Sequence, residues 1–260
     1  MDLGIEGRAA IVTGASKGIG LATARLLARE RARVLMVARG EGALRAAAIE
    51  GEVATFAADV TDPDAADAIV EACEERFGAA DILVNNAGTS SAVALDELTD
   101  EQWQEQWDLN VMASMRLMRA AAPAMQSRGW GRIVNVSSSS GKRPSSTNAA
   151  YTVAKTAQLA LSRVYADAFA HSGVLVNAVT PGPVATGLWT APGGMADQTA
   201  ALKGISREQV LEEVSGRVPV GRLGSDDEIA WVIAFLCSER ASNVAGASWS
   251  VDGGTVPSFL

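Results

Sequence analysis

The chain of 260 residues has one histidine and two cysteines. A single histidine, His171, cannot supply a three-histidine zinc site, and any histidine-based triad would depend on it alone. It stands where a helical pattern gives way to Gly173, so we interpret it as a residue near a helix end. Cys73 and Cys237 lie in apolar helical patterns without the short spacing of a metal site, which predicts reduced thiols and no bound metal.

The sequence has fewer basic than acidic residues. Lys and Arg total 22 against 30 Asp and Glu, a formal net charge of −8, so there is no broad basic field for nucleic acid or an anionic membrane. No apolar run is long enough to span a bilayer, and acidic residues precede the first apolar run of the opening MDLGIEGRAAIVTGAS. We therefore expect neither a spanning helix nor a signal peptide, and we expect a cytoplasmic protein.

Apolar runs alternate with longer helical patterns along the chain, and no repeat or proline-rich linker divides it. Strands are predicted at 9–13, 33–38, 53–58, 82–85, 132–137, 174–179 and 247–251. Strands that are apolar on both faces and separated by helices indicate a parallel sheet covered on both sides. The expected fold is α/β, a Rossmann-like doubly wound seven-stranded parallel sheet with helices on both faces, in one domain over residues 1–260. Ligands bind such sheets beyond the carboxyl ends of the strands.

The segment from 187 to about 215 breaks this alternation, with Pro192 and Gly193 among apolar residues such as Trp189. Irregular backbone with apolar side chains beside the expected ligand edge favours a mobile cover over the substrate. We therefore predict a lid at about 187–215, with a structural loop as the alternative, and assign Trp189 to substrate binding.

The turn after the first predicted strand reads TGASKGIG and leads into a helical pattern. Free N–H groups at such a helix start point toward a diphosphate, although the glycine spacing departs from G-x-G-x-x-G and an ordinary strand-to-helix turn is the alternative. The residues assigned here to cofactor binding are Gly14, Ser16, Lys17, Gly18, Ile19 and Gly20.

The end of the second predicted strand indicates which nucleotide is bound. An acidic residue there would accept hydrogen bonds from the adenosine ribose, but the sequence has Arg39. An arginine at this position can hold a 2′-phosphate, with Lys17 as a second cation, so NADP(H) is favoured over NAD(H). The alternative is that both cations are only solvated surface charges. The ends of the next two strands add cofactor contacts at Asp59, Val60, Asn86, Ala87 and Gly88.

Tyr151 and Lys155 open the helix after the fifth strand, which ends near Ser138. Their i, i+4 spacing places phenol and ammonium on one helix face. We expect the cation to lower the pKa of the phenol and to make it an acid–base group for carbonyl reduction, with Ser138 holding the substrate oxygen. Alone, this spacing usually marks an ordinary helix surface.

Together these motifs resemble the short-chain dehydrogenase/reductase family over residues 9–254. The matching stretches are 13–20, 85–88, Asn110 in WDLNV, Ser138, Tyr151 with Lys155, Pro181-Gly182 with Thr186, and the closing VDGG. The resemblance implies a catalytic tetrad of Asn110, Ser138, Tyr151 and Lys155, of which Lys155 also binds the nicotinamide ribose. It further implies a homotetramer and a nicotinamide surrounded by Pro181, Gly182, Val184 and Thr186.

Within the family the chain is most similar to 3-oxoacyl-acyl-carrier-protein reductases, in runs such as GRIVNVSS and TPGPVAT. The resemblance implies reduction of a 3-oxoacyl thioester, and the short Tyr-to-Lys interval argues against the enoyl reductase branch. The positions that face the carrier protein are Gly129 and Ser172 here, which argues against an acyl carrier protein as partner. Neighbouring Arg128 and Arg132 are the alternative contacts.

Substrate assignment is limited to a few positions. Ser140 joins Trp189 as a predicted substrate residue, and we hypothesise that Lys142 and Arg143 meet a carboxylate or phosphate at the rim. Two further functions stay open, namely a dehydrogenase acting on another hydroxy compound (a sugar, steroid or small alcohol) and a catalytically silent nucleotide-sensing protein.

Overall fold

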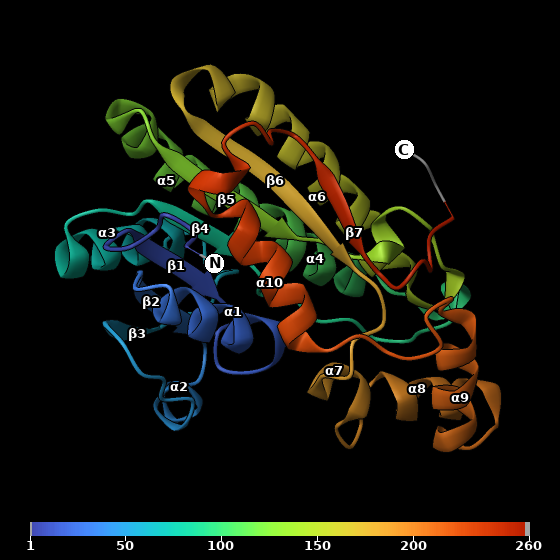
Figure 1. Ribbon diagram of the computed structural model, residues 1–260. Helices are drawn as coiled ribbons and strands as arrows, with labels where there is room; N and C mark the ends of the chain where they lie inside the picture. Colours follow the sequence, from blue (N-terminus) through green and yellow to red (C-terminus); the bar gives the residue numbers. More distant parts are fainter. Residues whose placement is uncertain (1, 258–260) are drawn as a thin grey trace.

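Seven strands, all parallel, form one sheet in the order β3-β2-β1-β4-β5-β6-β7 (Figure 1). The computed structural model describes residues 2–257. The strands are β1 (Ala9–Thr13), β2 (Arg33–Ala38), β3 (Val53–Ala57), β4 (Ile82–Asn85), β5 (Gly131–Val136), β6 (Val174–Pro181) and β7 (Ser248–Val251). Strand order reverses between β1 and β4, which opens a crevice at their carboxyl ends. The predicted doubly wound fold is confirmed.

The predicted strand bounds hold for β1, β2 and β4. Strands β3, β5 and β7 differ from prediction by one residue at an end or in position. Strand β6 runs two residues further than predicted, to Pro181, because β7 pairs with it from Ala178 to Pro181. That extension depends on a neighbour seventy residues away, so local sequence could not indicate it.

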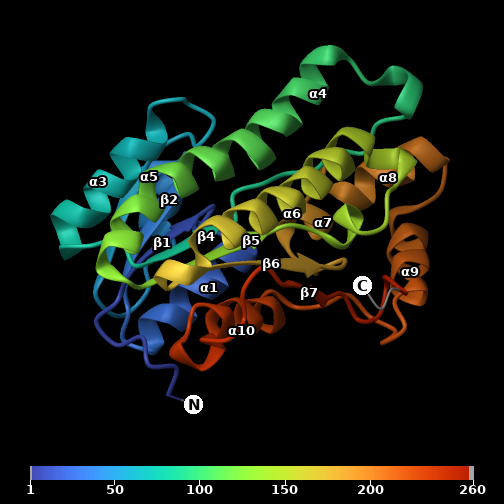
Figure 2. The ribbon, with the colours of Figure 1, turned by 90° about the horizontal axis from the view of Figure 1, so that it is seen from above.

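Helices cover both faces of the sheet (Figure 2). Helices α1 (Gly18–Arg29) and α10 (Asp226–Leu236) lie on one face, and α3 (Ala65–Phe77), α5 (Ala113–Arg128) and α6 (Ala149–Phe169) lie on the other. Helix α2 (Glu41–Ala46) follows β2, and α4 (Asp100–Trp107) continues through one π-helical turn (Asp108–Met112) into α5.

The interior strand β1 shows why both faces need cover. Its side chains alternate, so that Ala10 and Val12 pack with Ile233 of α10, whereas Ile11 packs with Met118 of α5. All five side chains are fully buried. A strand that is apolar on both faces is stable only between two helix layers, as the sequence pattern predicted.

The segment 187–215 is mostly helical, so the prediction of irregular backbone was wrong. It forms α7 (Gly187–Thr190), α8 (Met195–Lys203) and α9 (Arg207–Arg217), which lie together beyond the carboxyl end of β6 (Figure 1). Gly204, at φ +64°, ends α8, and Ser206 caps α9 through a capping box with Gln209. Gly204, one of the glycines that suggested a loop, is therefore a helix-end signal. That this segment acts as a lid stays a prediction.

The scarce residues have structural roles. Cys73 and Cys237 are free and buried, as predicted, and burial raises the pKa of each thiol to about 12. His171 lies exposed in a 3₁₀ turn that follows α6, near a helix end as predicted.

Within residues 2–257, no helix is both long and apolar enough to cross a membrane. In the same range, no group of His, Cys, Asp and Glu side chains could hold a metal ion.

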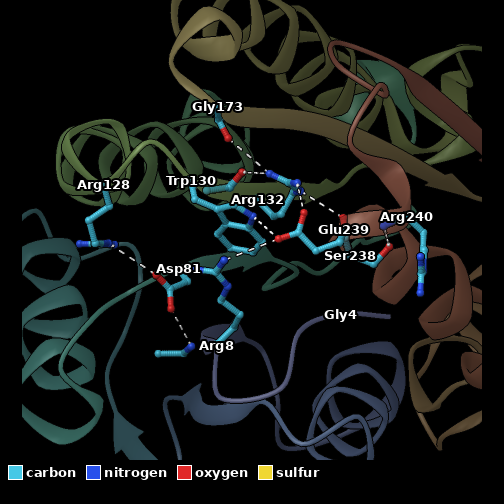
Figure 3. A network of polar contacts seen from close by, with 12 residues as sticks. Gly4, Arg8, Asp81, Arg128, Trp130, Arg132, Gly173, Ser238, Glu239 and Arg240 are labelled. Atoms are coloured by element: carbon cyan, nitrogen blue, oxygen red, sulfur yellow. Dashed lines mark hydrogen bonds and ion pairs between the residues drawn. The ribbon is translucent and has the colours of Figure 1, made fainter. Parts of the chain in front are cut away.

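A polar network joins the amino-terminal edge of the sheet to the chain segment after α10 (Figure 3). Arg132 of β5 is 3% exposed, donates to the carbonyls of Gly173 and Ser238, and lies 3.6 Å from a Glu239 oxygen. The Trp130 indole donates to the other Glu239 oxygen at 2.7 Å. Arg132 is thus committed to the fold rather than to a partner surface.

Arg128 is also engaged within the fold. Its guanidinium donates to the Ala80 carbonyl at 2.6 Å and pairs with Asp81 at 3.5 Å. Arg132 is therefore buried within the fold, whereas Arg128 pairs with Asp81 and stays exposed.

Replacing Glu239 by Ala should lower the free energy of unfolding by about 2 kcal/mol, because the buried Arg132 guanidinium loses its counter-charge and the Trp130 indole loses its acceptor. Urea denaturation measures the difference. Glu71, an exposed residue of α3, makes no ion pair within residues 2–257, so Glu71→Ala should change stability by less than about 0.5 kcal/mol. Equal losses in the two variants would show that the network is not stabilising.

Candidate active site

A cleft of about 910 Å³ opens at the carboxyl ends of the strands. Residues that directly follow several strands line it, among them Gly14 after β1, Arg39 after β2 and Ser137 after β5. This is the edge at which doubly wound sheets bind ligands. The predicted site residues that line the cleft are Gly14, Ser16, Lys17, Gly18, Ile19, Arg39, Asp59, Val60, Asn86, Ala87, Gly88, Ser138, Ser140, Tyr151, Lys155, Pro181, Gly182, Val184, Thr186 and Trp189. Two others, Gly20 and Asn110, do not line it.

The glycine turn is held against the end of β4. Gly14 has φ +65°, and a Cβ there would stand 2.9 Å from the Asn86 side-chain nitrogen, so only glycine is accommodated. Asn86 donates from its side chain to the Thr13 carbonyl at 2.8 Å. The first turn of α1 has no acidic residue, and Lys17 makes no side-chain cap, which leaves the helix start free to bind an anion.

Gly20 has a packing role, and its predicted cofactor contact stays a prediction. A Cβ at Gly20 would lie 2.4 Å from both the Gly14 carbonyl oxygen and the Asn86 side-chain nitrogen. The residue therefore allows α1 to approach the turn closely.

Arg39, Asp59 and Lys17 line the end of the cleft where β2 and β3 finish and the turn after β1 begins. The Arg39 side chain is 81% exposed, and its Nη1 lies 4.0 Å from an Asp59 oxygen. Hydrogen bonds from the Thr61 backbone and hydroxyl hold the pKa of Asp59 below its usual value, and the charge of Arg39 lowers it further. Two exposed cations are thus available to a phosphate group.

Ser138, Tyr151 and Lys155 meet at the other end of the cleft. Ser138 follows β5, and its hydroxyl accepts a hydrogen bond from the Ser140 amide. Lys155 is 3% exposed, and its Nζ lies 5.7 Å from the centroid of the Tyr151 ring. The i, i+4 spacing on α6 thus places the lysine beside the tyrosine, as expected.

Burial governs the charges of this pair. It raises the pKa of Tyr151, against the opposing effect of a hydrogen bond with Ser138, and it lowers the pKa of Lys155 to about 7. The expectation that Lys155 lowers the pKa of Tyr151 is therefore not met by the chain's own groups. The reason is that a low-dielectric site disfavours phenolate and ammonium alike, and the sequence does not reveal that burial.

A buried hydrogen-bonded chain connects Lys155 to the helical irregularity at Asn110. Lys155 Nζ donates to the Val136 carbonyl at 2.8 Å and to Gln158 Oε1 at 3.1 Å. Gln158 donates to the Ser114 hydroxyl, which in turn donates to the Asn110 carbonyl, at 2.8 and 3.2 Å. The lysine is thereby held at a fixed position between β5 and the start of α5.

Asn110 lies behind the cleft, fully buried in the π-helical turn. Its amide nitrogen donates to the carbonyl and the side chain of Gln106, whereas its Oδ1 has no partner within residues 2–257. A Cβ on Gly88 would stand 3.3 Å from this oxygen and 3.6 Å from Lys155 Nζ. Gly88 therefore lies close to both the Asn110 amide oxygen and the Lys155 ammonium group.

The loop after β6 forms one wall of the cleft. A Cβ on Gly182 would lie 2.8 Å from the Asp252 backbone, so glycine permits close contact with the segment after β7. The Val184 segment is fixed by Gly224, whose backbone receives a hydrogen bond from Ala185 at 2.9 Å. This wall is therefore preorganised by the residues that precede α10.

Lys142 and Arg143 do not reach the cleft, which contradicts the rim hypothesis. Lys142 Nζ donates to the Ser248 carbonyl at 2.7 Å and to the Ser250 hydroxyl at 2.9 Å, and Arg143 donates to the Thr255 carbonyl. Partial burial lowers the pKa of Lys142. Both side chains bind the strand β7 region instead of facing a substrate.

Three polar residues of the site were not predicted from the sequence. Gln158 could have been noticed from its i+3 spacing to Lys155 on one helix. Glu105 and Ser90 line the cleft from α4 and from the loop after β4, and no local pattern marks them. Their position depends on how α4 folds over α6, which is a tertiary property.

The comparisons with known proteins agree with this geometry. The family model described as enoyl-(acyl carrier protein) reductase matches residues 14–256. The chain belongs to the short-chain dehydrogenase/reductase family.

Curated relatives of this short-chain dehydrogenase/reductase include ketone reductases and hydroxy-acid dehydrogenases. It is 36% identical to 3-oxoacyl-(acyl-carrier-protein) reductase of Vibrio cholerae over 254 residues, 97% of this chain and 98% of the relative. It is 35% identical to D-beta-hydroxybutyrate dehydrogenase of Rhizobium meliloti over 257 residues, 95% and 98% of the two chains.

Solved structures of similar proteins cover the whole of this short-chain dehydrogenase/reductase. L-sorbose reductase from Gluconobacter frateurii, complexed with NADPH and L-sorbose, has a TM-score of 0.92 and 38% identity and covers 100% of both chains. A variant of actinorhodin polyketide ketoreductase with NADPH has a TM-score of 0.88 and 34% identity, covering 95% of this chain and 97% of that one.

Proposed function

We propose that the protein is an NADP(H)-dependent oxidoreductase that interconverts a ketone and a secondary alcohol. The observation that carries the proposal is one continuous cleft with Arg39 and Lys17 at one end and Ser138, Tyr151 and Lys155 at the other. Relatives that are 3-oxoacyl reductases, and solved relatives with bound NADPH, support the same function.

The residues of the cleft suit a dinucleotide phosphate. The start of α1 would bind the diphosphate through backbone N–H groups, which the positive φ angles of Gly14 and Gly18 aim into the turn. Arg39, with Lys17, would hold a 2′-phosphate, since no acidic residue ends β2 to accept a ribose hydroxyl. When bound, the nicotinamide supplies or accepts a hydride at the substrate carbon.

The chain's own groups supply the proton and hold the oxygen. Tyr151 donates its phenolic proton to the carbonyl oxygen, and the Ser138 hydroxyl binds the same oxygen as negative charge develops. Burial raises the pKa of Tyr151, so the phenol is protonated at neutral pH and ready to donate. Lys155, fixed by Val136 and Gln158, would stabilise the phenolate left behind when its amine is protonated.

Mixing the protein with NADPH and a panel of activated ketones tests this function, with cofactor absorbance as the measurement. We expect oxidation of NADPH only when a ketone is present, and a lower rate with NADH. NADPH binding without turnover of any ketone would favour a nucleotide-sensing protein. Oxidation only with 2-enoyl thioesters would favour an enoyl reductase.

We further propose a homotetramer in the cytoplasm. Two separate apolar surfaces support assembly. On α10, Trp231 is 52% exposed, and Phe235 of the same helix stacks on the partly exposed Trp249 of β7. On α6, Val164 and Val153 are 63% and 48% exposed. Two unrelated faces suffice for a dimer of dimers.

A 3-oxoacyl thioester is the substrate that the resemblance implies, but two observations speak against a carrier-bound one. Gly129 and Ser172 stand at the positions expected to carry positive charge, and the neighbouring Arg128 and Arg132 are engaged within the fold. We therefore propose a substrate that is free rather than bound to a carrier protein.

A further inference from the structure

The Tyr151 end of the cleft is walled by polar side chains of α4 and of neighbouring loops. A side cavity of about 250 Å³ adjoins it, and Glu105, Gln106, Asn148 and Tyr151 line both spaces. Ser90 lines the cleft from the loop after β4. We call Ser90, Glu105, Gln106 and Asn148 the substrate end.

The substrate end has hydrogen-bonding capacity that the fold leaves unused. The Ser90 hydroxyl belongs to a residue that is 8% exposed, and it has no partner within residues 2–257. Gln106 accepts from Asn110 through its Oε1, and Asn148 accepts from Thr152, so the NH₂ group of each amide stays available as a donor. A buried hydroxyl without a partner is costly, which favours a ligand that supplies one.

The charged residue of the substrate end, Glu105, is acidic. Glu105 makes no ion pair in the described part of the chain, residues 2–257. The basic residues that line the cleft are Lys17 and Arg39, assigned to the nucleotide phosphate, and Lys155. Lys142 and Arg143, which the sequence suggested as cations for a carboxylate or phosphate, contact the β7 region instead. Lys155 is held beside Tyr151 by Val136 and Gln158, so a carboxylate bound at the substrate end would face Glu105 with no cation among Ser90, Gln106 and Asn148 to offset it.

We propose that the substrate end selects uncharged ketones with hydroxyl groups on the carbons beside the carbonyl, and that Glu105 rejects substrates that carry a carboxylate. Ser90, Gln106 and Asn148 bind the hydroxyl groups. The inference rests on the proposed reductase function, and it names the substrate class of the same site.

The test compares three ketones of four carbons with NADPH. Erythrulose is neutral and hydroxylated, butanone is neutral without hydroxyl groups, and acetoacetate is anionic. We expect kcat/KM to fall in that order for the unmodified protein. Glu105→Arg should raise kcat/KM for acetoacetate relative to butanone about tenfold, because repulsion near the carboxylate becomes attraction. Ser90→Ala should lower kcat/KM for erythrulose relative to butanone about tenfold, because a bound hydroxyl loses its partner.

Glu101→Arg is the matched control, because Glu101 is an exposed residue of the same helix that lines neither cavity. It undergoes the same change of charge and should leave the three kcat/KM ratios unchanged. A preference of the unmodified protein for acetoacetate, or an equal response to Glu101→Arg and Glu105→Arg, would overturn the inference while leaving the reductase function intact. Failure to reduce any ketone with NADPH would overturn both.

Discussion

Replacing Tyr151 by Phe should lower kcat for ketone reduction about 10³-fold, because the variant keeps the ring and loses the proton that the carbonyl oxygen receives. The Kd for NADPH should change by less than about threefold, since the lost hydroxyl is assigned to chemistry and not to nucleotide binding. Steady-state kinetics and fluorescence titration with NADPH measure the two quantities separately.

Tyr165→Phe is the matched control, since Tyr165 is the other tyrosine of the chain and lies on the same helix. Its hydroxyl donates to the Met115 carbonyl at 3.4 Å and does not face the cleft. This variant should keep its kcat. Substantial reductase activity in Tyr151→Phe, at the level of the Tyr165→Phe protein, would show that another group donates the proton.

Replacing Arg39 by Asp should shift the ratio of kcat/KM for NADPH over NADH about 100-fold toward NADH. The change removes a charge-assisted contact to the 2′-phosphate, introduces repulsion in its place, and supplies an acceptor for a ribose hydroxyl. The partner Asp59 is already negative, with its pKa held below the usual value, so it adds to the repulsion of a phosphate. Kinetics with each cofactor at a fixed ketone concentration measure the ratio.

Arg45→Asp provides the comparison for this prediction. Arg45 lies on α2, pairs with Glu41 and does not line the cleft, so its reversal makes the same change in net charge away from the site. Its cofactor ratio should stay at the original value. If both arginine variants had the same ratio as the unmodified protein, Arg39 would be only a solvated surface charge.

The sequence by itself determined the sheet, the glycine turn, the cation at the end of β2 and the spacing of Tyr151 and Lys155. These features depend on apolar periodicity, on strand ends and on neighbours within one helical turn, all of which are local. Local signals gave a wrong prediction of irregular backbone at 187–215. In the structure Gly204 ends α8 and Ser206 caps the start of α9.

Only the tertiary structure decided the electrostatics and the surroundings of the site. Burial, which depends on contacts between distant segments, sets the pKa of Tyr151 and Lys155 and commits Arg132 to Glu239 across the sheet edge. The packing of α4 over α6 places Glu105 beside Tyr151, far from it in sequence. A residue's chemical type is local, whereas its charge state and its neighbours are fixed by how distant parts of the chain exclude water around it.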